Sequence, residues 1–365
     1  MATNVTASAL LDAQARLTSV FAPGTDTPSR YEYRSKVKTA EAMLMEHNAI
    51  TRAISDDTGN CIGHRVYWPK VGDTTLDYNG DKSTPSLSLA CTIPSGTGPV
   101  TAAKTYSHNL ALIKRVELDD NLCGNLFQFT ELAAERLAAG TLAIRKALNT
   151  KFINFLDTNK SAVNNDASLP SGMTFGSSMF SVDNSILDLQ NPDTLTDLDA
   201  VMLNNEIEDW FYVSGRYNFY NARVNSQYHR LNDTERDHIR FDDYDMYFDI
   251  KSLDSTLSGS NTFAVGRGSY VFWDHVDGGL SQIPQEVDER TFEYFVDDPM
   301  LMVNANGVMR PLRYSVRYQY VCDAVNNTRM RQTNIHRWEI ILHGGLWVAP
   351  AGSSGETGIM KFKKA

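Results

Sequence analysis

The chain has 365 residues, of which 42% are hydrophobic and 21% charged, and its formal net charge is −10. This is the composition of a globular protein with room for about two or three sub-domains. The acidic balance excludes a protein whose main task is to grip phosphates, because such proteins concentrate Lys and Arg.

The sequence carries no signal for export and none for cysteine chemistry. Residues 1–17 lack the basic segment followed by an apolar segment that marks a secretory signal. The most apolar late stretch, IILHGGLWVA at residues 340–349, is far shorter than the ~20 residues that span a bilayer. The four cysteines include no C-x-x-C pair. We therefore expect synthesis in a reducing cytoplasm, no membrane partner and no cysteine-based metal site.

The N-terminal part of the chain, residues 1–63, is predicted to be an arm. Residues 22–30 have the Pro, Gly and Thr content of a linker, and residues 35–54 have the spacing of a helix. Two interpretations are open. The helix packs on the body of its own chain, or the arm reaches a neighbouring molecule.

Residues 64–118 predict a long excursion shaped like a hairpin. Residues 64–71 and 106–118 have the pattern of strands, and the polar stretch between them carries a turn signal at Asn79-Gly80. A two-stranded hairpin is marginally stable on its own in water. The excursion is therefore either flexible or stabilised by packing against another structure.

A single long helix is predicted over residues 124–157. The mean globular helix has about three turns, whereas this stretch predicts about nine, or on the order of 48 Å. Such a helix must either lie on an elongated body or bridge between separate parts. Glu131, Glu135, Arg145 and Lys146 are expected to lie off its apolar stripe. The stripe consists of Leu126, Phe129, Leu132, Leu137, Ile144, Leu148, Phe152 and Phe155.

The remainder of the chain predicts a mixed body closed by two long strands. Residues 196–305 mix helical and strand patterns. Residues 312–322 and 334–350 alternate apolar and polar side chains over about twice the usual strand length. Gly344-Gly345 is expected to bend or bulge the second strand. The predicted fold class is α+β, with one long helix laid across a few long strands.

No group of residues predicts catalysis. The sequence has no G-x-S-x-G, no P-loop and no H-E-x-x-H motif, and its eight histidines lack ligand spacing. The stretch DDYDMYFD at residues 242–249 lacks the glycine and glutamate of a calcium loop and is interpreted as a solvated strand face. We predict no catalytic, cofactor-binding or metal-binding residue and no enzyme. A metal-dependent hydrolase using this aspartate cluster is the remote alternative.

Two stretches and the order of the elements resemble a known family. The stretch QTNIHRWEIILHGGLWVAP at residues 332–350 resembles the closing strand of the family, and DWFYVSGRYNFYNARVNSQ at residues 209–227 is similar to its central strand-then-helix stretch. The arm, β-excursion, very long helix, mixed body and two-stranded return follow the same order. The family is the major capsid protein of tailed bacteriophages, which has the Hong Kong 97 fold.

This resemblance implies a Hong Kong 97-like α+β capsid fold with five parts. They are an N-terminal arm with a short helix (residues 1–63), an extended β-hairpin loop (64–118), a peripheral domain with the spine helix (119–195), an axial domain (196–305), and return strands of the peripheral and axial sheets (306–365). Some members cross-link a loop lysine to a neighbouring asparagine. Lys70, Lys82 and Lys104 lie in the matching region, but no partner asparagine or activating acid can be identified.

The resemblance also implies a function. The protein would self-assemble through pentamers and hexamers into an icosahedral head in the virion, enclosing double-stranded DNA without sequence-specific binding. Scaffold, portal and decoration proteins are the implied partners, and no cofactor is implied. Two alternatives stay open: an encapsulin-type nanocompartment shell, which has the same fold but packages protein cargo, and another virion structural protein such as a tail or baseplate component.

Overall fold

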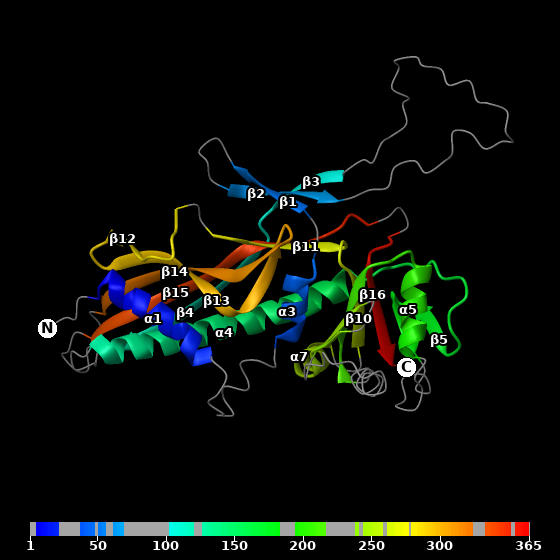
Figure 1. Cartoon of the computed structure of the whole chain (residues 1–365), viewed down its shortest axis with the longest axis horizontal. Coiled ribbons are helices and arrows are strands. Elements are labelled where there is room, and N and C mark those ends of the chain that lie inside the picture. The colour runs from blue at the N-terminus through cyan, green and yellow to red at the C-terminus, as the bar shows by residue number, and fades with distance from the viewer. Residues whose placement is uncertain are drawn as a thin grey trace, which may run out of the picture.

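The structure is a computed structural model (Figure 1). It describes residues 5–21, 37–47, 50–55, 61–68, 102–119, 126–182, 194–216, 238–240, 244–257, 261–276, 279–323, 333–351 and 355–364. These residues form a six-stranded, a seven-stranded and a three-stranded sheet, so the predicted mixed α+β class is confirmed. Figure 1 shows an elongated molecule with the two larger sheets towards opposite ends. None of the helices in the described part of the chain has the length and hydropathy needed to cross a membrane.

The long helix α4 runs from Leu126 to Thr158, which is 33 residues or about 50 Å. It confirms the single helix predicted from the sequence. The stripe residues Phe129, Leu137, Ile144, Leu148 and Phe152 are buried. Figure 1 shows α4 lying along the strands of the six-stranded sheet. The approach is close, since a side chain on Gly140 would overlap Ile340 of that sheet.

The six-stranded sheet contains the longest strands of the molecule. Its strands are β4 (Leu110–Asp119), β11 (Tyr270–His275), β12 (Gln285–Asp288), β13 (Thr291–Ala305), β14 (Val308–Asp323) and β15 (Thr333–Val348). The order is β11-β15-β14-β13-β12, and β4 also pairs with β15. All these pairings are antiparallel. The face towards α4 buries Tyr294 of β13. It also buries residues of β14 and β15 that the alternation predicted, namely Tyr314, Val316, Tyr318, Trp338, Ile340 and Leu342.

Of the bend or bulge predicted at Gly344-Gly345, the bulge is wrong. The pairing of β15 with β11 passes through both residues without a shift in register, and the pairing with β4 ends at Gly344. The glycines are needed for close contact instead. A side chain on Gly344 would overlap the backbone carbonyl of Trp273, and one on Gly345 would overlap the ring of Trp347.

The seven-stranded sheet lies at the other end of the molecule; one of its faces has a core of its own, and the other belongs to the main core. Its strands, in spatial order, are β5 (Met173–Gly176), β6 (Met179–Val182), β16 (Ile359–Lys364), β10 (Asn261–Gly266), β7 (Trp210–Ser214), β9 (Asp245–Phe248) and β8 (His238–Arg240). The pairs β6–β16 and β7–β9 are parallel. Helices α5 (Thr194–Asn204) and α7 (Ile250–Leu257) belong to the same region. The core includes Phe180, Met202, Tyr212, Met246 and Phe362.

The three-stranded sheet consists of β1 (Ile50–Ser55), β2 (Cys61–Trp68) and β3 (Ala102–Ser107) in that order. It follows two N-terminal helices, α1 (Ala7–Phe21) and α3 (Lys38–Met45). The helix predicted over residues 35–54 is therefore wrong in its second half. The β-branched residues there pair antiparallel with β2, and this tertiary pairing overrides the helical spacing. The turn signal at Asn79-Gly80 lies outside the described residues.

Candidate functional site

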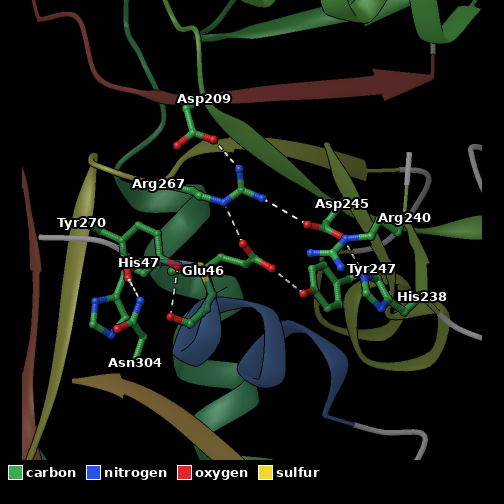
Figure 2. Close-up of polar contacts among 11 residues, drawn as sticks. Glu46, His47, Asp209, His238, Arg240, Asp245, Tyr247, Arg267, Tyr270 and Asn304 are labelled. Carbon is green, nitrogen blue, oxygen red and sulfur yellow. Dashed lines mark hydrogen bonds and ion pairs between the residues drawn. The ribbon is translucent and has the colours of Figure 1, made fainter. Parts of the chain in front are cut away.

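The described residues bring charged groups together where α3 meets the seven-stranded sheet. Arg267 lies in the turn between β10 and β11. Its Nε donates a hydrogen bond to Glu46 Oε2 at 2.7 Å, and one Nη donates to Asp245 Oδ2 at 3.1 Å. The other Nη donates to Asp209. Figure 2 shows Arg267 between these three carboxylates, which come from the end of α3, the start of β7 and the start of β9. We call these four residues the arginine junction.

Two aromatic groups extend the arginine junction. The hydroxyl of Tyr247 donates to Glu46 Oε1 at 2.5 Å, and His238 stacks on Tyr247 with ring centroids 4.3 Å apart. His238 Nε2 lies 3.0 Å from Asp245 Oδ1. Burial alone would raise the pKa of the Asp245 carboxyl, but His238, Arg240 and Arg267 together hold it below its usual value. Asp245 is therefore ionised at neutral pH.

The contacts of this cluster indicate a structural role. A His–Asp pair is catalytic when it activates a nucleophile or a bound metal. The nearby hydroxyl, that of Tyr247, is already donated to Glu46, and burial raises its pKa further above its usual range. No group of three or more metal-binding side chains was found among the described residues. The cluster joins α3 to the seven-stranded sheet through charge-assisted hydrogen bonds.

The aspartate cluster predicted at residues 242–249 is partly visible. Asp245 and Asp249 are buried, so the solvated strand face predicted for them is wrong. Asp249 Oδ2 accepts hydrogen bonds from the Thr39 hydroxyl at 2.7 Å and from Asn149 Nδ2 at 2.8 Å. Its Oδ1 accepts from the Ser252 amide at 3.1 Å, in the first turn of α7. The Asp249 carboxylate therefore joins α3, α4 and α7. Asp242 and Asp243 lie outside the described residues.

His47 connects α3 to the three-stranded sheet and is almost fully buried. Its carbonyl accepts a hydrogen bond from Asn304 Nδ2 at 2.8 Å, as Figure 2 shows. Neither ring nitrogen has a hydrogen-bond partner among the described residues. Burial lowers the pKa of His47 to about 4, although Asp274 opposes this shift. The ring is neutral at physiological pH.

A buried ion pair fixes α4 on the six-stranded sheet. Arg145 Nε and Nη2 each donate to Asp298 at 2.6 Å, and both side chains are fully buried. The Tyr314 hydroxyl and the Leu301 amide also donate to this carboxylate, at 2.6 and 2.9 Å. The position expected for Arg145, off the apolar stripe, is therefore wrong. No sequence pattern around Arg145 indicates this pairing, because its partner lies 153 positions away.

The three-stranded sheet rests on the face of the six-stranded sheet opposite α4. Val66 and Trp68 of β2 pack against Val271 of β11 and Trp347 of β15. Trp347 Nε1 donates to the carbonyl of Ser107 at 3.2 Å. In Figure 1 this small sheet lies above the long strands, while α4 lies below them. These contacts involve β11 and one end of β15.

Comparison with known proteins gave matches among solved structures. No family model matches the sequence, and no curated protein matches it. Forty chains of solved structures match. The cyanophage Pam1 capsid asymmetric unit is 10% identical, covers 91% of this chain and 93% of its own, and has a TM-score of 0.44. A structure from Mycobacterium phage Bobi is 11% identical, with coverage of 96% and 98% and a TM-score of 0.40. The capsid structure of cyanophage P-SCSP1u is 10% identical, with coverage of 88% and 87% and a TM-score of 0.38.

Proposed function

We propose that the chain is the major capsid protein of a tailed bacteriophage, and that it self-assembles into an icosahedral head around double-stranded DNA. One observation carries the proposal. A small three-stranded sheet packs through Val66 and Trp68 on the face of the six-stranded sheet opposite α4. Three strands are about the smallest sheet that is stable on its own, and only when it has a hydrophobic face to bury. This is the expected base of an extended loop that completes its contacts on another copy.

We assign the roles that the resemblance implies to parts of the fold, with β11, β12 and β13 moved from the axial part (residues 196–305) to the peripheral one because they belong to the six-stranded sheet. In the proposal, α4 is the spine helix and the six-stranded sheet is the core of the peripheral domain. The seven-stranded sheet is the axial domain, and β2 and β3 are the base of the extended loop. Head-to-tail contacts between copies generate closed rings. Pentamers and hexamers of this kind would tile the shell, with scaffold, portal and decoration proteins as further partners.

Exposed apolar side chains supply candidate contact points between copies. Val287 and Ile283 are exposed in and beside β12, and Val308 is exposed at the turn between β13 and β14. All four residues of β12 are exposed, and β12 ends the order of the sheet. An edge strand with exposed apolar side chains is a typical site of association.

Shortening the chain between β2 and β3 tests the proposal. We expect replacement of residues 73–100 by a short Gly/Ser linker to leave a folded protein that forms no shells, because the contact to the next copy is lost. Circular dichroism checks folding, and electron microscopy of the purified protein checks assembly. A Gly/Ser segment of the original length is the matched control. It distinguishes the effect of losing the native side chains from the effect of shortening the segment.

The result also decides between the related functions. Wild-type-like shells from the shortened variant would contradict the role of this segment. Wild-type shells that protect DNA from nuclease support a phage head. Closed shells that enclose protein instead would identify a nanocompartment, and tubes or open rings would identify a tail or baseplate component.

A further inference from the structure

Histidines gather where the three-stranded sheet contacts the body. The His64 ring of β2 is buried between Trp273 of β11 and Trp347 of β15, with centroid distances of 5.1 and 5.8 Å. The His108 ring, just after β3, lies 5.4 Å from the His64 ring. The His275 ring, at the end of β11, stacks on His108 at 4.8 Å. We call these five residues the histidine patch.

The carboxylate that acts on the histidine patch is already engaged elsewhere. Asp274 of β11 favours protonation of His64. However, Arg310 of β14 donates to Asp274 Oδ2 at 2.8 Å, and the Arg313 amide donates to the same oxygen at 3.0 Å. The Arg310 guanidinium also lies over Trp273, 5.5 Å from the ring centroid. The patch therefore borders a cation, and its acid is neutralised.

Two further histidines lie near the histidine patch. The register of β11 and β15 sets His343 opposite His275. His47 is influenced by the same Asp274 from the link that precedes β1. On β2 itself, Arg65 is exposed, while His64 and Val66 beside it are buried. The side chains around the patch are therefore mainly histidines and arginines. A positive charge added there finds few free carboxylates to balance it.

The geometry favours titration over metal binding. His108 and His275 are stacked with an interplanar angle of 28°, so their ring faces meet, and their nitrogens do not converge on one point. A shared metal ion needs ring nitrogens aimed at a common centre. The described residues contain no group that meets that requirement.

We propose that the histidine patch is an acid-sensitive latch, which holds the three-stranded sheet on the body while the His64 imidazole is neutral and releases the sheet when that imidazole is protonated. The latch itself stands on the contacts within one chain. Its consequence for shell assembly rests on the proposed function, in which this sheet is the base of the extended loop. Acid would then change the position of the loop before it changes the rest of the fold.

The sign follows from His64. Burial, followed by the neighbouring His108 and His275, lowers its pKa to about 4 from 6.5. Its contribution to attachment is complete above about pH 6.5 and is lost as the pH falls towards about 4. Over this window each pH unit favours the detached form by up to about tenfold for this group.

Hydrogen exchange of the unassembled full-length chain tests the latch. Corrected for intrinsic exchange rates, protection of β2 and β3 should fall at least about tenfold between pH 7.5 and pH 5, while α4 stays protected. His64→Phe fills the same aromatic site without a titrating nitrogen, and this variant should keep its protection at pH 5. Protection of β2 and β3 that is independent of pH in the wild type would overturn the proposal.

A matched pair of lysine variants gives a second test at constant pH. His108→Lys places a permanent charge in the patch, so β2 and β3 should lose protection at pH 7.5 by at least about tenfold. Thr105→Lys adds the same charge at an exposed position of β3 and should leave protection within about twofold. Equal behaviour of the two variants would contradict the latch. Because neither test needs a shell, a working latch in a chain that never forms shells refutes only the proposed function.

Discussion

At the scale of single residues, the Arg145–Asp298 pair shows how α4 is held. Both side chains are fully buried, and Asp298 accepts hydrogen bonds from Tyr314 and from backbone amides in addition to Arg145. Desolvating two charges is costly, so such a pair is stable only when its hydrogen bonds are satisfied. Here they are, and the pair determines the position of α4 along the sheet.

We expect Arg145→Met to destabilise the protein by about 3–5 kcal/mol, because it leaves the Asp298 carboxylate buried without its cation. Urea unfolding of the unassembled protein, followed by circular dichroism, measures the change. Arg136→Met, at an exposed position of the same helix, is the control and should cost less than about 0.5 kcal/mol. A similar loss in both variants would show that helix propensity, and not the ion pair, is responsible.

The burial of Arg145 lies beyond what sequence patterns can predict. Its neighbour Ile144 is on the apolar stripe, and an arginine at the edge of a stripe usually extends its head to solvent. Only the fold brings Asp298 to this position. The same holds for Asp249, whose donors Thr39 and Asn149 come from two other helices.

At the scale of elements, hydrophobic periodicity predicted the helices and strands that bury one face against the core. The helix α4 and the strands β14 and β15 bury the side chains that their patterns indicated. Where pairing with another segment decides the structure, the patterns failed. Residues 50–55 form β1 because β2 lies beside them. The alternation around β9 correctly indicated a strand, but all four of its residues are buried, so the solvated face expected there is wrong.

The stripe of α4 gives a prediction at this scale. Leu137 is 1% exposed, and Leu137→Asp places a carboxylate against the six-stranded sheet without a partner. We expect most of this variant to be insoluble when expressed, as measured by the soluble fraction after centrifugation. Ala139→Asp introduces the same residue two positions further, on the exposed side of the helix. Normal soluble yield from both variants would show that the stripe is not buried.

At the scale of the whole molecule, the arginine junction lies where α3 and α4 meet the seven-stranded sheet, one face of which shares the main core. Glu46 belongs to the end of α3, which packs with α4 and β13, whereas Asp209 and Asp245 belong to the seven-stranded sheet. Arg267 contacts all three carboxylates and is mostly buried. Removing it would leave like charges close together in a region of low solvent access.

We therefore expect Arg267→Met to lower the free energy of unfolding by about 3 kcal/mol at pH 7.5. Arg240 approaches the same Asp245 at 3.5 Å, but its side chain is 67% exposed. Arg240→Met is thus a matched control that should cost less than about 1 kcal/mol. Denaturant unfolding measures both variants, and equal losses would mean that Arg267 acts only as a surface charge.

The position of β16 has a consequence for synthesis. This strand, Ile359–Lys364, lies between β6 and β10 in the seven-stranded sheet, although β6 ends at Val182. The ribosome must therefore translate far beyond β6 before that sheet can close. Until then, β6 and β10 each expose an unpaired edge, which is a hazard for aggregation in a nascent chain. The edges of β6 and β10 are therefore protected from non-native strand pairing only after β16 has been translated.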